Sequence, residues 1–239
     1  MSKYRCCVLD MIEDRRIPQP MDVTRTGPSL RRLIPYEEFD YQALLAALSG
    51  YSRPRDKITD LLRKGTIIRV KKGLYVFGQD YRQGPFSREI LANLICGPSY
   101  ISLEYALHYH GLIPESVETV TSVTCGRSCR FRTPVGLFTY WSIPLQAFHA
   151  GMNRIELSDG RAFLMASPEK ALADKLRSDR KTAIVTQKSL REYLADDLRV
   201  GIEQIARLDA AYMTEIGRRY QSRRIRLLSE LIRRLSQTH

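Results

Sequence analysis

The sequence contains no apolar run long enough to cross a membrane. A spanning helix needs about 18 or more consecutive apolar residues, and charged or polar residues interrupt every hydrophobic stretch before that length. In the N-terminal stretch MSKYRCCVLDMIEDRR, Asp10, Glu13 and Asp14 break the short apolar segment, which argues against a secretory signal peptide. We therefore expect a cytoplasmic protein with no membrane partner.

Cysteine is scarce. Five cysteines in a chain without an export signal are most simply reduced thiols. Cys125 and Cys129 form a CxxxC motif with no second pair nearby, and Cys96 is remote in the sequence. His108 and His110 are two residues apart on an expected helix, where they face different directions and cannot chelate one ion. The sequence therefore predicts no metal site.

The motifs of common enzymes are missing as well. The chain has no GxGxxG or GxxxxGK[ST] glycine loop and no nucleophile paired with a base in a recognisable pattern. Glu169 and Asp174 occur in ASPEKALADKL, where Ser167 has the position of a helix N-cap and Glu169 that of a first-turn dipole partner. We expect a protein that is not an enzyme and needs no cofactor.

Acidic residues are too few to balance the basic ones. The chain holds 38 lysines and arginines against 26 aspartates and glutamates, a formal net charge of +12. This excess favours a polyanionic partner, because cations that neutralise phosphates release condensed counterions.

Composition divides the chain into three parts. Residues 1–36 hold four prolines and several arginines, so we expect a basic, extended N-terminal arm. Residues 37–80 have the pattern of a small helical module. Residues 81–239 are long enough for a second domain with its own core, which begins in the linker-like stretch GQDYRQGPFSR.

Residues 37–80 predict a winged helix-turn-helix. Two apolar stripes at helical spacing are separated by Gly50, and the second stripe ends at Gly65. The runs TIIRV (Thr66–Val70) and LYVF (Leu74–Phe77) then predict a hairpin with a basic tip, Lys71-Lys72-Gly73. Helix, helix and basic-tipped hairpin in this order predict a module that places its second helix in the major groove of double-stranded DNA.

The candidate DNA contacts lie between residues 53 and 72. Arg53 and Arg55 begin the second helix, where arginines can form paired hydrogen bonds with guanine. Thr59 suits a thymine methyl or a phosphate, and the lysines of the hairpin tip suit phosphates. The alternative is a charged face that only meets solvent. The predicted set of contacts is Arg53, Arg55, Lys57, Thr59, Arg63, Lys64, Lys71 and Lys72.

Residues 81–239 predict segregated helices and strands. Helices near 87–96 and 99–110 precede strands at 117–124, 129–132, 137–143, 154–157 and 162–165. The last third predicts helices at 167–176, 187–194 and 202–208 and one long helix at 210–235. The expected fold class is therefore α+β, a winged helix followed by a larger mixed domain with a helical C-terminal part. Arg127, Arg130 and Arg132 form a second candidate basic surface. It could extend the DNA footprint, or it could bind a partner or an RNA phosphate. The alternative is that these arginines only face solvent.

The run LLRKGTIIRVKKGLYVF resembles the winged helix of the AbiEi family of antitoxins, from type IV toxin–antitoxin systems of bacteria. YISLEYALHYHGLIPE, the region around FTYWSIP, and ASPEKALADKL are similar in kind and order to that family's second domain, so the resemblance spans residues 37–180. It implies a repressor of its own operon whose second domain counters a neighbouring nucleotidyltransferase-like toxin. Only the DNA contacts between Arg53 and Lys72 carry over by residue. The first 35 residues and the arginine-rich last helix have no counterpart.

Two other functions remain open at this point. One is a transcription regulator of another class, whose second domain senses a ligand or a partner. The other is an RNA-binding module, which would stack unpaired bases on aromatic side chains.

The size of the module predicts how DNA would be bound. One winged helix reads only a few base pairs, so we expect two copies on an inverted-repeat operator. We expect a monomer in solution that loads cooperatively on DNA. An apolar stripe on the last helix could instead be a dimer contact, or could pack on its own domain: Ile225, Leu228, Ile232 and Leu235.

Overall fold

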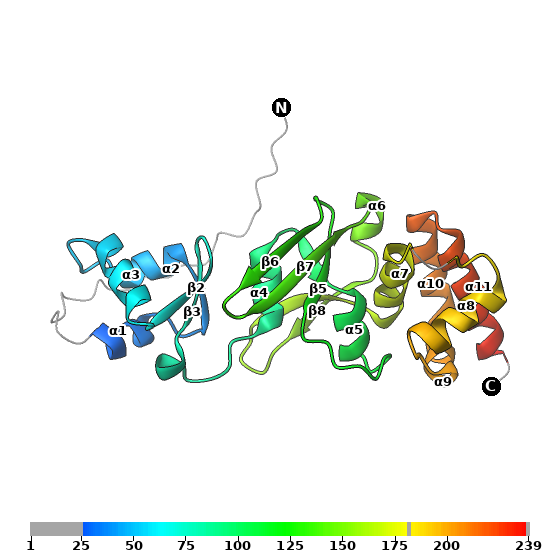
Figure 1. Cartoon of the computed structure of the whole chain (residues 1–239), viewed down its shortest axis with the longest axis horizontal. Coiled ribbons are helices and arrows are strands. Elements are labelled where there is room, and N and C mark those ends of the chain that lie inside the picture. The colour runs from blue at the N-terminus through cyan, green and yellow to red at the C-terminus, as the bar shows by residue number, and fades with distance from the viewer. Residues whose placement is uncertain (1–25, 181–182, 238–239) are drawn as a thin grey trace, which may run out of the picture.

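The computed structural model describes residues 26–180 and 183–237. Figure 1 shows three parts along the long axis: a small unit of helices and strands, a central sheet with helices against it, and a group of helices at the C-terminal end. The expected mixed α+β fold with a helical C-terminal part is confirmed. Most of the expected N-terminal arm, residues 1–25, lies outside the described residues.

The N-terminal unit contains a three-stranded antiparallel sheet with the order β1-β3-β2. Local signals set its boundaries. The Asp40 side chain accepts a hydrogen bond of 2.8 Å from the backbone N–H of Ala43 and so caps α2. Pro54 opens α3, where its missing N–H is not needed. The elements are α1 (Thr26–Leu33), β1 (Glu38–Asp40), α2 (Tyr41–Ala47), α3 (Pro54–Arg63), β2 (Ile67–Lys71) and β3 (Leu74–Phe77).

The expectation of an extended arm is wrong for residues 26–36. This segment forms α1, and Leu30 and Ile34 are buried in the same core as Phe39 and Leu44. Pro28 does not prevent the helix, because it stands in the first turn, where no backbone N–H has a partner within the helix. The N-terminal unit therefore starts about ten residues before the boundary at residue 37 that composition indicated.

Strand β3 belongs to two cores. Tyr75 and Phe77 pack in the core of the N-terminal unit, whereas Leu74 and Val76 pack in the large core of the second domain. Successive side chains of a strand point to opposite faces, so the sheet of the N-terminal unit has one face on its own helices and the other on the second domain. The two units are therefore packed against each other, and the segment between them contains a short 3-10 helix, η1 (Gln79–Tyr81).

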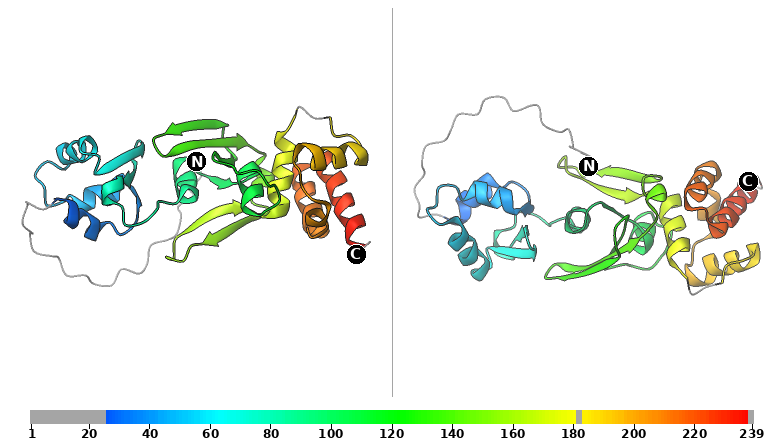
Figure 2. Two further views of the ribbon diagram at one scale, coloured as in Figure 1. Left: turned by 60° about the horizontal axis from the view of Figure 1, so that its bottom comes forward. Right: turned by 90° about the horizontal axis from the view of Figure 1, so that it is seen from above.

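The second domain is built on a six-stranded sheet with the order β6-β7-β5-β4-β9-β8. The pairs β5–β7 and β4–β9 are parallel, and the other neighbours are antiparallel. In Figure 2 the β6–β7 and β8–β9 pairs extend on either side of α4. The elements are α4 (Arg88–Ile95), β4 (Ser99–Ile101), α5 (Leu103–Tyr109), β5 (Val120–Thr124), β6 (Cys129–Thr133), β7 (Gly136–Ser142), α6 (Leu145–Phe148), β8 (Met152–Glu156) and β9 (Ala162–Ala166).

One predicted helix of this domain is partly wrong. Residues 99–110 were expected to form a single helix, but Ser99–Ile101 form β4 and only Leu103–Tyr109 are helical. Strand β4 is paired on both sides, with β5 and β9, and all three of its residues are buried. These pairings in the middle of the sheet outweigh the helical spacing of the local sequence. The five predicted strands are confirmed, with shifts of a few residues at their ends.

The predicted long helix at 210–235 is two helices. Gln221 adopts a left-handed backbone conformation with φ of 51°, which ends α10 and turns the chain back on itself. Of the predicted apolar stripe, Ile225, Leu228 and Ile232 are fully buried against the rest of the domain, and Leu235 is partly buried against the same core. The stripe is therefore not available as a dimer contact. The C-terminal elements are α7 (Pro168–Ser178), α8 (Gln187–Glu192), a π-helical turn η2 (Tyr193–Asp197), α9 (Ile202–Ala206), α10 (Ala210–Tyr220) and α11 (Arg223–Ser236).

A buried ion pair within α7 is hydrogen-bonded to Tyr220 of α10. The Nζ of Lys170 lies 3.0 Å from Oδ1 of Asp174, and neither side chain reaches solvent. Lys170 also donates to the carbonyl of Ala147 and to the hydroxyl of Tyr220, which in turn donates to Asp174. The other carboxylate oxygen of Asp174 accepts hydrogen bonds from Tyr100 and from Ser102 in the segment that joins β4 to α5. Burial lowers the pKa of Lys170, and the charge of Asp174 opposes that effect.

Candidate nucleic-acid interface

Helix α3 lies on the side of the N-terminal unit that is turned away from the second domain (Figure 1), and most of its basic side chains are exposed. Ile58 and Leu61 fix its orientation, because both are buried in the core of the unit. Arg53, just before the helix, is 82% exposed and lies 3.9 Å from Asp56 in a weak surface pair. Arg55 is also exposed, and it forms no ion pair with any acid in the described part of the chain. The start of α3 therefore offers two extended guanidinium groups.

The second half of the exposed face is organised by one acid. The carboxylate of Asp60 lies 2.9 Å from the side-chain nitrogens of both Arg63 and Lys64, and 3.7 Å from that of Lys57. Hydrogen bonds from Lys64 and Arg63 lower the pKa of Asp60, so it stays ionised near neutral pH. These three predicted contacts are thus held together around a single negative charge.

Two of the predicted contacts are partly engaged within the unit. The hydroxyl of Thr59 donates to the backbone carbonyl of Arg55 at 3.2 Å, which leaves the oxygen able to accept and the methyl group exposed. The ammonium of Lys57 lies 5.3 Å from the ring centroid of Tyr51, and its side chain is only 18% exposed. The ammonium of Lys57 therefore adds positive charge to this surface but does not extend far into solvent.

The hairpin tip does not place its two lysines together. Lys72 is exposed at the turn between β2 and β3, as expected. Lys71 instead points to the second domain, where its ammonium donates a hydrogen bond of 2.6 Å to the carbonyl of Ile95 and lies 5.4 Å from the ring centroid of Phe131. The register of the hairpin shifts between Arg69 and Lys71, so Lys71 pairs with Leu74 on the face that meets the second domain, whereas Lys72 lies in the turn. Lys71 is therefore separated from the other predicted contacts.

One exposed basic side chain of this unit was not in the predicted set of contacts. Arg69, in the middle of β2, is exposed and lies over the ring of Tyr75, 5.9 Å from its centroid. The signal was present in TIIRV, where Arg69 stands between residues that face the interior. Arg31 of α1 is not comparable, because it is bound to Glu37 and lies over Phe77.

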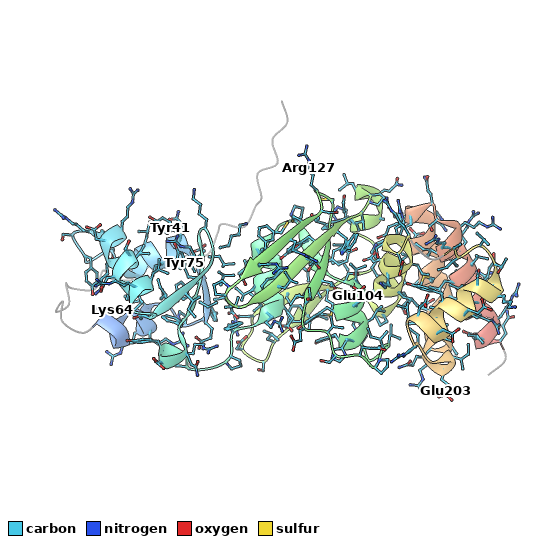
Figure 3. The ribbon with its side chains drawn as sticks, in the orientation of Figure 1. Tyr41, Lys64, Tyr75, Glu104, Arg127 and Glu203 are labelled. Carbon is cyan, nitrogen blue, oxygen red and sulfur yellow. The ribbon has the colours of Figure 1, made fainter. Side chains whose placement is uncertain are left out.

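The second predicted basic surface lies on the edge strand β6 and in the turn that precedes it. Arg130 and Arg132 are exposed on one face of the edge strand β6, opposite Thr139 and Leu137 of β7. Trp141 follows on the same face and is 49% exposed. Arg127 projects from the β5–β6 turn (Figure 3). This surface lies on the second domain and is separate from the face of α3.

Other expectations concern metals and thiols. Among the described residues, no group of three or more histidine, cysteine or acidic side chains is placed to hold a metal ion. Cys96, remote from Cys129 in sequence, is close to it in space, with their sulfurs 3.7 Å apart. Nε2 of His110 lies 2.8 Å from the carbonyl oxygen of Ala166, and His108 is exposed.

Within residues 26–180 and 183–237, no helix combines the length and apolar character that a bilayer crossing requires.

Comparison of the chain with protein-family models and with curated proteins gave no match in either case.

Proposed function

We propose that this chain binds double-stranded DNA with a winged helix formed by residues 26–77, and that α3 is the recognition helix. The observation that carries the proposal is the order of elements, helix–strand–helix–helix–strand–strand, closed by a sheet of order β1-β3-β2. In a winged helix this order leaves the third helix free to enter the major groove. Here that helix is α3, with its basic face turned outward.

The charges on that face support contact with phosphates and bases. Arg53 and Arg55 have the length and the exposure to reach guanine edges from the start of α3. Lys64, Arg63 and Lys72 lie further along the same unit and suit backbone phosphates. Lys71 is left out of this set, because its ammonium is hydrogen-bonded to the second domain.

At the level of the cell, we propose an antitoxin of the AbiEi kind that represses its own operon in the cytoplasm. The support is the resemblance of the four sequence stretches together with the two-unit architecture, in which a large α+β domain follows the DNA-binding unit. The operator is proposed to be an inverted repeat bound by two copies that are monomers in free solution. The burial of the α11 stripe supports this order of assembly, since that face cannot also hold a second copy.

Selection of bound duplexes from a random pool tests the DNA-binding part of the proposal. We expect enrichment of an inverted repeat that also occurs upstream of the gene, and sedimentation of the free protein as a monomer. Recovery of unrelated sequences with no common element would contradict specific binding. Co-expression with the neighbouring reading frame tests the antitoxin part: the full chain should restore growth that the neighbour alone inhibits.

A second candidate function rests on the other basic surface. Exposed Trp141 beside Arg130 and Arg132 is an arrangement that can stack an unpaired base and hold its phosphates. Competition between a duplex and a single-stranded RNA of equal length decides between the two surfaces. If Trp141→Ala weakens RNA binding and leaves duplex binding unchanged, the second domain has its own nucleic-acid site.

A further inference from the structure

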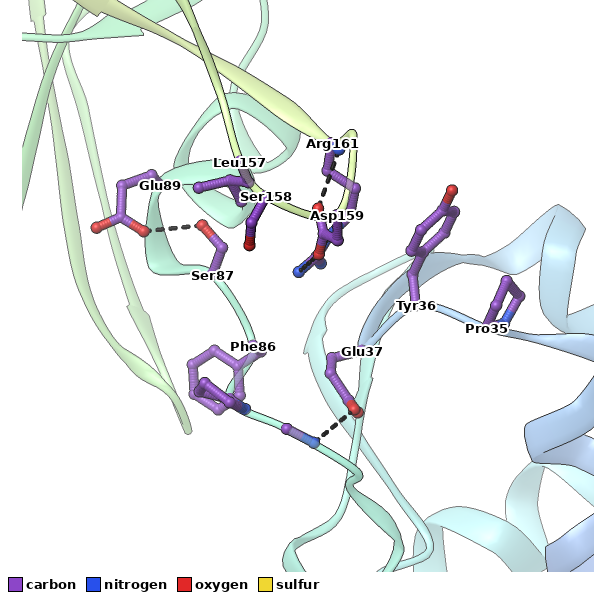
Figure 4. Close-up of a pocket in the computed structure, with 12 residues that line it drawn as sticks. Pro35, Tyr36, Glu37, Phe86, Ser87, Glu89, Leu157, Ser158, Asp159 and Arg161 are labelled. Atoms are coloured by element: carbon purple, nitrogen blue, oxygen red, sulfur yellow. Dashed lines mark hydrogen bonds and ion pairs between the residues drawn. The ribbon is translucent and has the colours of Figure 1, made fainter.

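Two of the contacts between the N-terminal unit and the second domain lie at separate places. In one, Arg161, in the turn before β9, is paired with Glu38 of β1 beside a pocket that both units line (Figure 4). In the other, the ammonium of Lys71 at the hairpin tip donates to the carbonyl of Ile95 and lies over the ring of Phe131. A pair of thiols lies beside this second contact.

The thiols of Cys96 and Cys129 touch each other. Their sulfurs lie 3.7 Å apart, although the two residues are 33 positions apart in the sequence. Both side chains are half-buried, one at the end of α4 and the other at the start of the edge strand β6. Because a disulfide brings its sulfurs to about 2.05 Å, only a short approach separates this pair from a covalent bond.

The pairing differs from the one that the sequence motif suggests. The CxxxC motif joins Cys125 to Cys129, and Cys125 is also half-buried, in the turn between β5 and β6. The sulfur in contact with Cys129 is nevertheless that of Cys96, which comes from another element. Cys125 is therefore a natural control for the reactivity of the pair.

Each thiol adjoins one of the two groups that receive the ammonium of Lys71. Cys96 directly follows Ile95, whose carbonyl accepts the hydrogen bond. Cys129 precedes Phe131 by two residues and so lies on the same face of β6. A bond between the two sulfurs would therefore tie the end of α4 to β6 at the place where the hairpin is docked.

The surroundings of Cys96 set the pace of any oxidation. Burial, together with the neighbouring sulfur of Cys129, raises the pKa of Cys96 to about 11, and the charge of Lys71 opposes this effect. Cys96 is therefore mainly a thiol near neutral pH. Because the thiolate is the nucleophile, we expect oxidation at the slow end of the range for disulfide formation, which runs from seconds to hours.

We propose that Cys96 and Cys129 are a reversible redox pair, which hydrogen peroxide closes into a disulfide that fastens the docking site of the hairpin. One sulfur attacks the peroxide, the O–O bond breaks, the sulfur takes up a hydroxyl group, and the other oxygen leaves as water with the thiol proton. The second sulfur then attacks the first, and the hydroxyl group leaves as water with the second thiol proton. Each sulfur gives up one electron, and the peroxide is reduced by two. The pair does not depend on DNA binding.

Peptide mapping of the full chain, reduced and then treated with hydrogen peroxide, tests the bond. Trypsin cleaves at Arg127, between Cys125 and Cys129, and chymotrypsin cleaves at Tyr100, between Cys96 and Cys125, so the three cysteines fall on separate peptides. We expect a cross-linked peptide that contains Cys96 and Cys129 and is lost on addition of dithiothreitol. The absence of this peptide, or a bond from Cys129 to Cys125 in its place, overturns the proposal.

The bond should also raise the melting temperature of the oxidised chain by roughly 5–10 °C, because it restricts the unfolded chain between residues 33 positions apart. Cys96→Ser and Cys129→Ser should each lose this rise. Cys125→Ser, the matched control, should keep it. An undiminished rise in Cys96→Ser or Cys129→Ser would assign the effect to another bond and overturn the pair.

Hydrogen exchange measures the effect of the bond on docking. In the oxidised chain, the backbone of residues 67–77 should exchange several-fold more slowly than in the reduced chain. Most of that slowing should be absent in Lys71→Ala, whose side chain no longer reaches the second domain. If the mapped disulfide forms and exchange in the hairpin is unchanged, the effect on docking is overturned, whereas the redox pair is supported by the peptide map.

Discussion

The ammonium of Lys71 donates a hydrogen bond of 2.6 Å to the carbonyl oxygen of Ile95, the last residue of α4. A cation at the C-terminal end of a helix also interacts favourably with the helix dipole. The tip of the hairpin in the N-terminal unit is thereby bonded to the second domain, and its two neighbouring lysines have different surroundings.

This difference predicts different effects of two adjacent substitutions. Lys72→Ala should flatten the dependence of duplex affinity on salt by about 0.9 in slope, the value for one lost phosphate contact. Lys71→Ala should leave that slope unchanged and lower the melting temperature instead. Fluorescence anisotropy titrations over a range of KCl concentrations, with a thermal melt of each variant, measure both. Equal flattening by the two substitutions would show that Lys71 leaves Ile95 to contact DNA.

Arg53 and Arg55 should control sequence preference. Replacement of either by alanine should cost about 1–3 kcal/mol on the selected duplex and relax discrimination at one position of the site. Arg191→Ala, on an exposed position of α8, is the control and should bind both duplexes as the parent does. Titrations against the selected and a scrambled duplex decide the point. Equal weakening on both duplexes would make the two arginines phosphate contacts.

Asp60 should limit the affinity for any duplex. Asp60→Asn removes the acid that holds Lys57, Arg63 and Lys64, so we expect tighter binding to all sequences, most clearly at low salt where charges are least screened. The same carboxylate also contributes to the free energy of unfolding. Because its pKa is lower in the folded chain than in the unfolded chain, this stabilising contribution is present above the unfolded pKa and is lost as the pH falls through the folded pKa. The measurement is duplex affinity at two salt concentrations, and weaker binding of Asp60→Asn would contradict the prediction.

The buried pair of Lys170 and Asp174 should be strongly coupled. Lys170→Met leaves a buried carboxylate without its counter-charge and should reduce the free energy of unfolding by about 3–5 kcal/mol. Adding Asp174→Leu should recover part of that loss, because both charges are then removed. Urea denaturation of the two single variants and the double variant gives the coupling energy. Additive losses would show that the two charges act independently.

Gln221 should be a site at which glycine stabilises the protein. Its left-handed conformation is unfavourable for a residue with a Cβ atom, and the preference of glycine for this position at a helix end predicts a gain of up to about 1 kcal/mol for Gln221→Gly. Gln221→Ala keeps the Cβ atom and is the matched control, with no gain expected. Chemical denaturation compares them, and equal stabilities would mean that the turn carries no strain.

Local sequence signals predicted the parts of the fold that short-range physics decides. Pro54 and Gly73 stand where a helix start and a tight turn were expected, and the exposed face of α3 follows from the spacing of Ile58 and Leu61. Contacts between distant residues could not be read in this way. Strand β4 exists because β5 and β9 flank it, and the turn at Gln221 carries none of the usual glycine signals.

The same distinction between local and long-range information applies to the candidate site. The basic residues of α3 could be identified because they alternate with a buried stripe on one helix. Two contacts depend on how the two units pack. One is the hydrogen bond of Lys71 to the second domain, and the other is the ion pair between Arg161 and Glu38, which are 123 residues apart in the sequence. No local pattern encodes that packing, so the interdomain pocket could not be anticipated.

The placement of alternate β3 residues in two cores restricts how this gene can change. A single-codon insertion within Leu74–Phe77 would move the residues on one side of it to the opposite face, so that side chains that belong to one core would meet the other. Substitutions that conserve volume can accumulate there one at a time, but a change in length would damage both cores at once. Natural variants of this chain should therefore carry their insertions and deletions elsewhere, and the four-residue length of this strand should be among its most persistent inherited features.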